Sequence, residues 1–192
     1  MVWDPDNQQR LAIRATSPGF TVRQWGNWYE YEGSYWVPEN KKGVDRGEPS
    51  RWVYAFHALI GHHGILSLTP VWLLSLVGLG IWLLGSDTSL RGLALMVATL
   101  TIVCLTFYLM LPLVDRNYGG VCCGFRWMFW FIPLWTICVL PAADRISRLG
   151  WLRGIGWGLL AVSIISASYA SLNPWAHPWI FDYWTHLEWI QY

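Results

Sequence analysis

A polar loop between two long apolar stretches carries residue types that bind anionic groups. It spans residues 115–126 (DRNYGGVCCGFR) and contains three glycines, which permit tight turns with exposed backbone. Arginine binds phosphate oxygens in pairs through its planar guanidinium group. The candidate phosphate ligands of this loop are Arg116, Asn117, Tyr118 and Arg126. The alternative is that both arginines anchor helix ends at a membrane surface, with Asp115 paired locally.

A second group of ionisable residues precedes the first long apolar stretch. It comprises Asp45, Arg46, Glu48, Arg51, His57, His62 and His63. A carboxylate beside a histidine can transfer protons, and histidines with a carboxylate can hold a metal ion. If the intervening segment is re-entrant, Asp115 joins this polar cluster, and Arg46 and Arg51 join the phosphate ligands. The alternative is an ordinary set of solvated charges and interfacial histidines. His62 and His63 would point apart on a regular helix, so we expect no metal and no cofactor.

Four apolar stretches must position these residues, at 66–84, 93–114, 127–143 and 155–172. None has a charged side chain in its interior, and each is about the length, roughly 17 to 25 residues, of a transmembrane helix. The chain of 192 residues is 54% hydrophobic and 13% charged, whereas about a quarter of the residues in soluble proteins are charged. The expected fold class is an all-α membrane protein with four transmembrane helices in residues 65–172.

The flanking segments lead to three further expectations. Residues 1–50 are polar and aromatic, and alternation at 20–25 and 29–37 predicts a small β-hairpin or three-stranded sheet. Residues 51–64 are too short to span and predict an interfacial or re-entrant helix, capped by Ser50. The proline-broken, aromatic tail at 173–192 predicts an interfacial helix.

Two patterns concern packing and orientation. Small residues recur along the last apolar stretch and predict close helix packing: Gly150, Gly154, Gly158, Ser163, Ala167 and Ser171.

Basic residues are more numerous in the short loops at 85–92 and 144–154, which are therefore expected to be cytoplasmic, with the N-terminal segment and the C-terminal tail extracytoplasmic. The net charge of +1 and the lack of a basic patch argue against a nucleic-acid partner.

Five segments carry a resemblance to a known family. They are Tyr118-Gly119-Gly120, Gly124-Phe125-Arg126-Trp127, Ile132-Pro133-Leu134, GHHGILSLTPV at 61–71 and GVDRGEPSRWVYAFH at 43–57. Together they resemble the C-terminal part of bacterial polytopic proteins related to the GT-C glycosyltransferases, the dolichyl-phosphate-mannose transferase-like group. The similarity is greatest to planctomycete-type membrane proteins and covers roughly residues 43–179.

The resemblance implies a bacterial inner-membrane protein that handles a sugar on a polyprenyl-phosphate donor at the outer face. The acidic residue that such enzymes use lies in an N-terminal external loop that nothing in this sequence matches, so we assign no catalytic residue and leave enzyme status open. The first hypothesis is therefore a protein equivalent to the C-terminal part of a glycosyltransferase, contacting anionic lipid or polyprenyl phosphate. The second is a noncatalytic membrane subunit or scaffold that binds partner helices.

Overall fold

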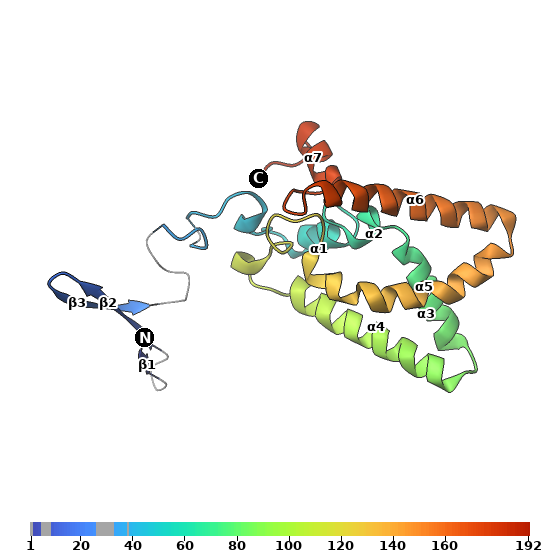
Figure 1. Cartoon of the computed structure of the whole chain (residues 1–192), viewed down its shortest axis with the longest axis horizontal. Coiled ribbons are helices and arrows are strands. Elements are labelled where there is room, and N and C mark those ends of the chain that lie inside the picture. The colour runs from blue at the N-terminus through green and yellow to red at the C-terminus, as the bar shows by residue number, and fades with distance from the viewer. Residues whose placement is uncertain (1, 5–8, 26–32, 38) are drawn as a thin grey trace. The chain divides into compact units, whose positions relative to one another are not determined.

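The computed structural model describes residues 2–4, 9–25, 33–37 and 39–192. The chain divides into two compact units, Met1–Gly43 and Val44–Tyr192, and Figure 1 shows their elements. The candidate phosphate ligands and the polar cluster all belong to the second unit.

The N-terminal unit contains a three-stranded antiparallel sheet with the order β1-β2-β3. Its strands are β1 (Val2–Asp4), β2 (Gln9–Thr16) and β3 (Gly19–Trp25). The strand expected at 20–25 is confirmed as β3, which pairs with β2 through Ile13–Val22 and Ala15–Phe20. Of the strands expected at 29–37, residues 29–32 lie outside the described part of the chain. The remainder, 33–37, forms turns and a bend, closed by the Asn40 side-chain amide, which donates to the Ser34 carbonyl oxygen at 2.7 Å.

The second unit is built from helices. Its α-helices are α1 (Arg51–Leu59), α2 (Ile65–Leu68), α3 (Trp72–Leu84), α4 (Thr88–Leu109), α5 (Ile132–Ser147), α6 (Gly150–Leu172) and α7 (Trp179–His186). Three 3-10 helices accompany them: η1 (Gly43–Arg46), η2 (Leu113–Asp115) and η3 (Arg126–Phe131). The helices expected at 51–64 and in the C-terminal tail are confirmed as α1, which Ser50 caps, and α7.

Three helical segments are long and apolar enough to cross a membrane: Thr88–Leu109, Arg126–Ser147 and Gly150–Leu172, with 22, 22 and 23 residues. The fourth expected span, 66–84, is wrong as a single helix, because the backbone breaks after α2 and α3 has only 13 residues. Pro70 disfavours helical backbone at Thr69 and lacks an N–H group. The Ser163 hydroxyl of α6 stabilises the break by accepting a hydrogen bond from the Val71 backbone N–H at 3.1 Å.

The observed helices also extend past the expected apolar stretches. Asp87 caps α4 through its Oδ1 atom, which accepts from the Ser89 and Leu90 backbone N–H groups at 2.8 and 3.1 Å, so α4 begins before Arg91. At its far end α5 continues to Ser147, and α6 begins at Gly150. The loop expected at 144–154 is therefore much shorter. Charged side chains near helix ends can extend toward water, so a helix need not end where the apolar stretch ends.

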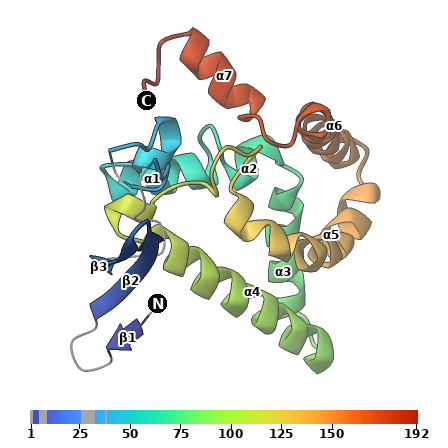
Figure 2. The same cartoon turned by 60° about the vertical axis from the view of Figure 1, so that its left-hand side comes forward.

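The helices α3 and α5 approach each other closely. A Cβ atom built on Gly78 would lie 1.7 Å from the Cys138 carbonyl oxygen, and Ser75 Oγ donates to the Trp135 carbonyl oxygen at 2.7 Å. Figure 2 shows α3 beside both α4 and α5, in agreement with the contacts between these helices. Gly154 and Gly158 on α6 are exposed, with no atom within 4 Å of an added Cβ. Gly154 and Gly158 therefore make no close packing among the described residues, whereas Ser163 of the same stripe is buried and Gly78 provides a close approach between α3 and α5.

The elements that carry the candidate site gather at one end of the long helices. In Figure 1, α1, α2, α7 and the loop before α5 lie at the end opposite the turns that join α3 to α4 and α5 to α6. The core at this end includes the fully buried side chains of Tyr54, Tyr118, Phe125 and Met128. The loop at 115–126 is therefore packed among helices.

Candidate functional site

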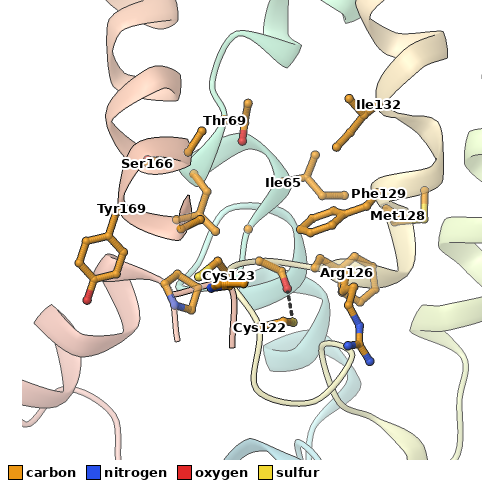
Figure 3. A pocket seen from close by; sticks show the side chains of 18 of the residues that line it. Ile65, Thr69, Cys122, Cys123, Arg126, Met128, Phe129, Ile132, Ser166 and Tyr169 are labelled. Carbon is orange, nitrogen blue, oxygen red and sulfur yellow. Dashed lines mark hydrogen bonds between the residues drawn. The ribbon is translucent and has the colours of Figure 1, made fainter. Parts of the chain in front are cut away.

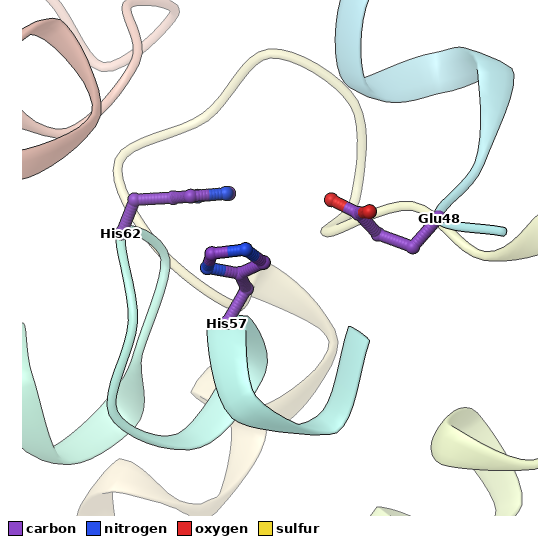
Figure 4. A group of neighbouring side chains, drawn as sticks. All are labelled: Glu48, His57 and His62. Carbon is purple, nitrogen blue, oxygen red and sulfur yellow. The ribbon is translucent and has the colours of Figure 1, made fainter. Parts of the chain in front are cut away.

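A buried group of polar side chains forms where α1 meets the turn that leads to α2. His57 lies on α1, His62 lies in the turn after it, and Glu48 precedes α1. Figure 4 shows the Glu48 carboxylate pointing toward the two imidazole rings. Each residue offers one ligand-capable atom, and these three atoms lie within 4.8 Å of one another. The structure thus brings together three members of the predicted polar cluster, from an irregular segment, a helix and a turn.

Hydrogen bonds extend this group to the 115–126 loop and to the C-terminal residue Tyr192. His62 Nε2 lies 2.7 Å from the Tyr192 hydroxyl, and that hydroxyl donates to Glu48 Oε1. Tyr118 donates to the same carboxylate oxygen at 3.0 Å. On its other side, His62 Nδ1 lies 2.5 Å from His63 Nδ1. The network therefore joins a loop residue, a turn and the C-terminal segment around one carboxylate.

The histidines of this network are held in the neutral form. Burial, with smaller contributions from His57 and His177, lowers the pKa of His62 to about 3. Burial also lowers the pKa of His63 well below its usual value, and lowers that of His57 and of His177. The Tyr118 and Tyr192 phenols have a raised pKa, mainly because of burial, so they act as hydrogen-bond donors.

Three ring nitrogens of the group have unused hydrogen-bonding capacity. His57 Nδ1, His63 Nε2 and His177 Nδ1 are buried without a hydrogen-bond partner in the described part of the chain. Ring stacking holds two of these histidines in place: His63 on Tyr118 at 4.4 Å and His177 on Phe181 at 4.0 Å between centroids. Buried imidazoles usually have partners, so this group has the features of a site for a proton or a cation.

The predicted phosphate ligands of the 115–126 loop separate into different roles. Arg116 is buried, and its guanidinium donates to the carbonyl oxygens of Leu111, Glu48 and Pro49 at 2.9, 3.1 and 3.0 Å. Asn117 Oδ1 accepts from the Gly119 and Gly120 N–H groups at 2.8 and 3.3 Å and so shapes the turn. Tyr118 belongs to the histidine network. These three side chains are therefore committed to contacts inside the protein.

The other predicted site residues differ in their exposure to solvent. Asp115, Arg46 and Arg51 are exposed, whereas Asp45 is buried. Asp45 is near enough to His177 to oppose the lowering of its pKa. Asp115 does not join the group formed by Glu48, His57 and His62.

Arg126 lies at the edge of an apolar pocket of about 510 Å³. The pocket lies between two of the three candidate spans, lined by Met128, Phe129, Ile132 and Trp135 on one and by Ser166, Ala167, Tyr169 and Ala170 on the other. Figure 3 shows Arg126 at one end of this pocket and Tyr169 across it. The Tyr169 hydroxyl donates to Asp182 at 2.7 Å. Among the residues that line the pocket, Arg126 carries the positive charge.

The Arg126 guanidinium is held by aromatic rings. Its central carbon lies 5.7 Å from the Trp127 ring centroid and 5.9 Å from that of Trp175. No carboxylate in the described residues forms an ion pair with it. The Arg126 side chain packs directly against the backbone of Gly119, which has φ +104°. Only glycine leaves room for it, because an added Cβ would lie 2.7 Å from Arg126 Cβ. Arg126 is thus a positioned cation beside an apolar cavity.

The adjacent cysteines are free thiols. Burial raises the pKa of Cys122 to about 11 and also raises that of Cys123. Because the thiolate is the reactive form, neither residue is suited to nucleophilic chemistry at neutral pH.

Sequence reasoning missed Tyr192 as a member of the network, and His177 as a histidine whose ring lies beside it, with centroids 5.7 Å from His63. Both lie in the aromatic tail, which its composition marked only as interfacial, and no local spacing links them to residues 48–63. Comparison with known protein families, curated proteins and solved structures finds no match to this chain. The pocket beside Arg126 and the polar network around Glu48 are therefore the features of this chain that indicate a function.

Proposed function

We propose that this is an integral membrane protein that binds a phosphate-bearing lipid in the pocket beside Arg126. The observation that carries the proposal is the position of this cation, unpaired in the described residues, at the rim of an apolar cavity between two long apolar helices. Apolar walls favour hydrocarbon because burial removes it from water. Guanidinium groups bind phosphate oxygens in pairs.

The position of the pocket along the long helices supports this proposal. It lies near the C-terminal end of α6 and the beginning of the Arg126–Ser147 segment, where helices of this length would meet the headgroup region. Trp127 and Trp175 flank the cation, and tryptophan favours that region of a bilayer. A lipid tail would then lie between α5 and α6, with its phosphate at Arg126.

The finer proposal is a polyprenyl phosphate that carries a sugar, bound at the extracytoplasmic side of a bacterial inner membrane. The histidine network lies beside the pocket: Tyr118 and Arg126 share one loop, and His63 precedes the pocket residue Gly64. A lipid headgroup at Arg126 would therefore be close to the buried Glu48 carboxylate and its hydrogen-bond partners. In this view the chain acts within a glycosyltransferase-like enzyme.

The test compares two lipids that differ only in the headgroup. Protein in detergent is titrated with a short-chain polyprenyl phosphate and with the corresponding polyprenol, and tryptophan fluorescence reports binding. We expect tighter binding of the phosphate by wild-type protein. Arg126→Met should weaken phosphate binding about 10- to 100-fold, as expected for loss of a charge-assisted contact of about 1.5 to 3 kcal/mol.

The exposed arginine Arg91, on α4 at the opposite end of the bundle, provides a matched control. Arg91→Met should leave phosphate binding unchanged. Equal binding of phosphate and alcohol, or equal loss in both variants, would refute the proposal.

A second function is favoured by the exposed glycine face of α6. Gly154 and Gly158 have open space around them, and small residues let helices approach closely in lipid. The chain would then be a noncatalytic subunit that binds a partner helix through this face. Stable copurification of a partner membrane protein that Gly154→Leu abolishes would support this function.

A further inference from the structure

The buried polar group at the end of α1 offers the donor atoms of a transition-metal site. We propose that Glu48, His57 and His62 bind one divalent transition-metal ion of the zinc class. The three ligand-capable atoms lie within 4.8 Å of one another, and all three residues are buried. Two imidazoles and a carboxylate form a set that holds zinc in catalytic sites, with the fourth position open.

The two imidazoles are oriented so that both can bind one metal ion. His57 and His62 stack with centroids 4.0 Å apart and planes inclined by 24°, and Figure 4 shows both beside the Glu48 carboxylate. His57 is only 8% exposed, and its Nδ1 has no hydrogen-bond partner in the described residues. Because this Nδ1 lies beside Gly61 and has no partner among the described residues, the ring loses no hydrogen bond there when its other nitrogen binds an ion.

This ligand set differs from the pairing that the sequence made improbable. His62 and His63 are not both ligands here. Instead, the Nδ1 atoms of His62 and His63 are joined at 2.5 Å, which leaves His62 Nε2 on the side of Glu48. A histidine ligand commonly uses its second nitrogen in such an outer contact, which fixes its tautomer and orientation.

The carboxylate is positioned by the same kind of outer contact. Tyr118 donates to Glu48 Oε1 at 3.0 Å. The Tyr192 hydroxyl donates to Glu48 Oε1 and lies 2.7 Å from His62 Nε2, between two of the proposed ligand atoms, so this phenol would have to move aside for an ion to enter. Zinc bonds of about 2.0 to 2.1 Å separate tetrahedral ligand atoms by roughly 3.3 Å, so metal binding would draw the three side chains closer together.

The donor types select the class of ion. Calcium and magnesium prefer oxygen ligands throughout, whereas imidazole suits zinc, copper, iron and nickel. A single carboxylate with two neutral imidazoles therefore favours the zinc class. This inference is independent of lipid binding, because Arg126 is not among the proposed ligands.

The test measures metal content and affinity in the full chain, purified in detergent with a tag that lacks histidine. After treatment with chelator and its removal, the protein is titrated with Zn²⁺ and with Co²⁺, whose visible absorption reports tetrahedral coordination. We expect one ion per chain. His57→Ala, His62→Ala and Glu48→Gln should each weaken zinc binding at least 100-fold, while His186→Ala, at an exposed histidine outside the group, should leave it unchanged.

A second measurement uses only the wild-type protein, in case the variants fail to fold. Zinc should raise its melting temperature relative to protein in chelator, because an ion that binds only the folded state stabilises it. Absence of both a bound ion and a thermal shift in wild-type protein would overturn the proposal. Folded variants that bind zinc as tightly as the His186→Ala control would also overturn it.

Discussion

The ring Nδ1 atoms of His62 and His63 lie 2.5 Å apart, although these residues are neighbours in the chain. Consecutive side chains on a regular helix point in different directions, but these two residues lie in the turn between α1 and α2. Their rings are inclined by 81°, with centroids 4.7 Å apart. The turn therefore contributes two histidines to one buried network.

Gly78 should be essential for the packing of α3 against α5. The Gly78→Ala substitution places a methyl group 1.7 Å from the Cys138 carbonyl oxygen, so the two helices must separate. Overpacking of this kind destabilises by about 1 to 3 kcal/mol. We expect a lower melting temperature, measured in detergent by circular dichroism.

Gly154→Ala is the matched control for that substitution. Gly154 is helical and exposed, with open space around it, and alanine favours helix over glycine by about 1 kcal/mol. The melting temperature of this variant should be unchanged or slightly higher. Equal destabilisation by both substitutions would contradict the assignment of the close helix approach to Gly78.

Arg116 should contribute to stability, in contrast to Arg126. Arg116→Met removes the donor to three carbonyl oxygens that lie in two separate segments. Hydrogen bonds from a charged group contribute about 1.5 to 3 kcal/mol, so the melting temperature should fall by several degrees. Arg126→Met should melt close to wild type, and the reverse order of the two variants would contradict these roles.

The buried histidines should make the metal-free protein less stable in acid. The folded pKa of His62 is lowered to about 3 from an ordinary value of 6.5, and that of His63 is lowered well below 6.5. Below pH 6.5 the unfolded chain binds protons that the folded chain does not, so stability decreases as the pH falls toward 3. For His62 the decrease is about 2 kcal/mol between pH 7 and pH 5, and His63 changes stability in the same direction.

Thermal melting in chelator from pH 7.5 to pH 5 checks this expectation. His186→Ala should show the same decrease as wild type, because His186 is exposed. A melting temperature that is constant over this range would indicate that the histidines are not held in a buried, neutral state.

The long apolar helices could be predicted from sequence, but their ends and breaks could not be fixed. Hydropathy marks most of α4 and α6 because an uninterrupted apolar run has few alternatives to a helix of that length. Thr69-Pro70 has the same local signature whether proline starts a helix or interrupts one. The contact that accompanies the interruption comes from Ser163, far along the chain.

The candidate site was predicted only in part, for a similar reason. Residue type marked Glu48, His57 and Arg126 as candidates, and the structure places the first two together and the third beside a pocket. Residue type alone gave no sign that Arg116 would donate to backbone oxygens, or that the Tyr192 hydroxyl would donate a hydrogen bond to Glu48. Such partners depend on the tertiary fold.

The central claim, a phosphate-bearing lipid in the pocket beside Arg126, is tested most directly by photolabelling. A polyprenyl phosphate with a photoreactive group near the phosphate is crosslinked to the protein in bilayers, and the labelled peptides are identified by mass spectrometry. We predict labels in residues 122–135 and 166–179, which line the pocket, with competition by unlabelled polyprenyl phosphate and loss in Arg126→Met. Labels spread along the exposed surface of α4, without competition, would contradict the account.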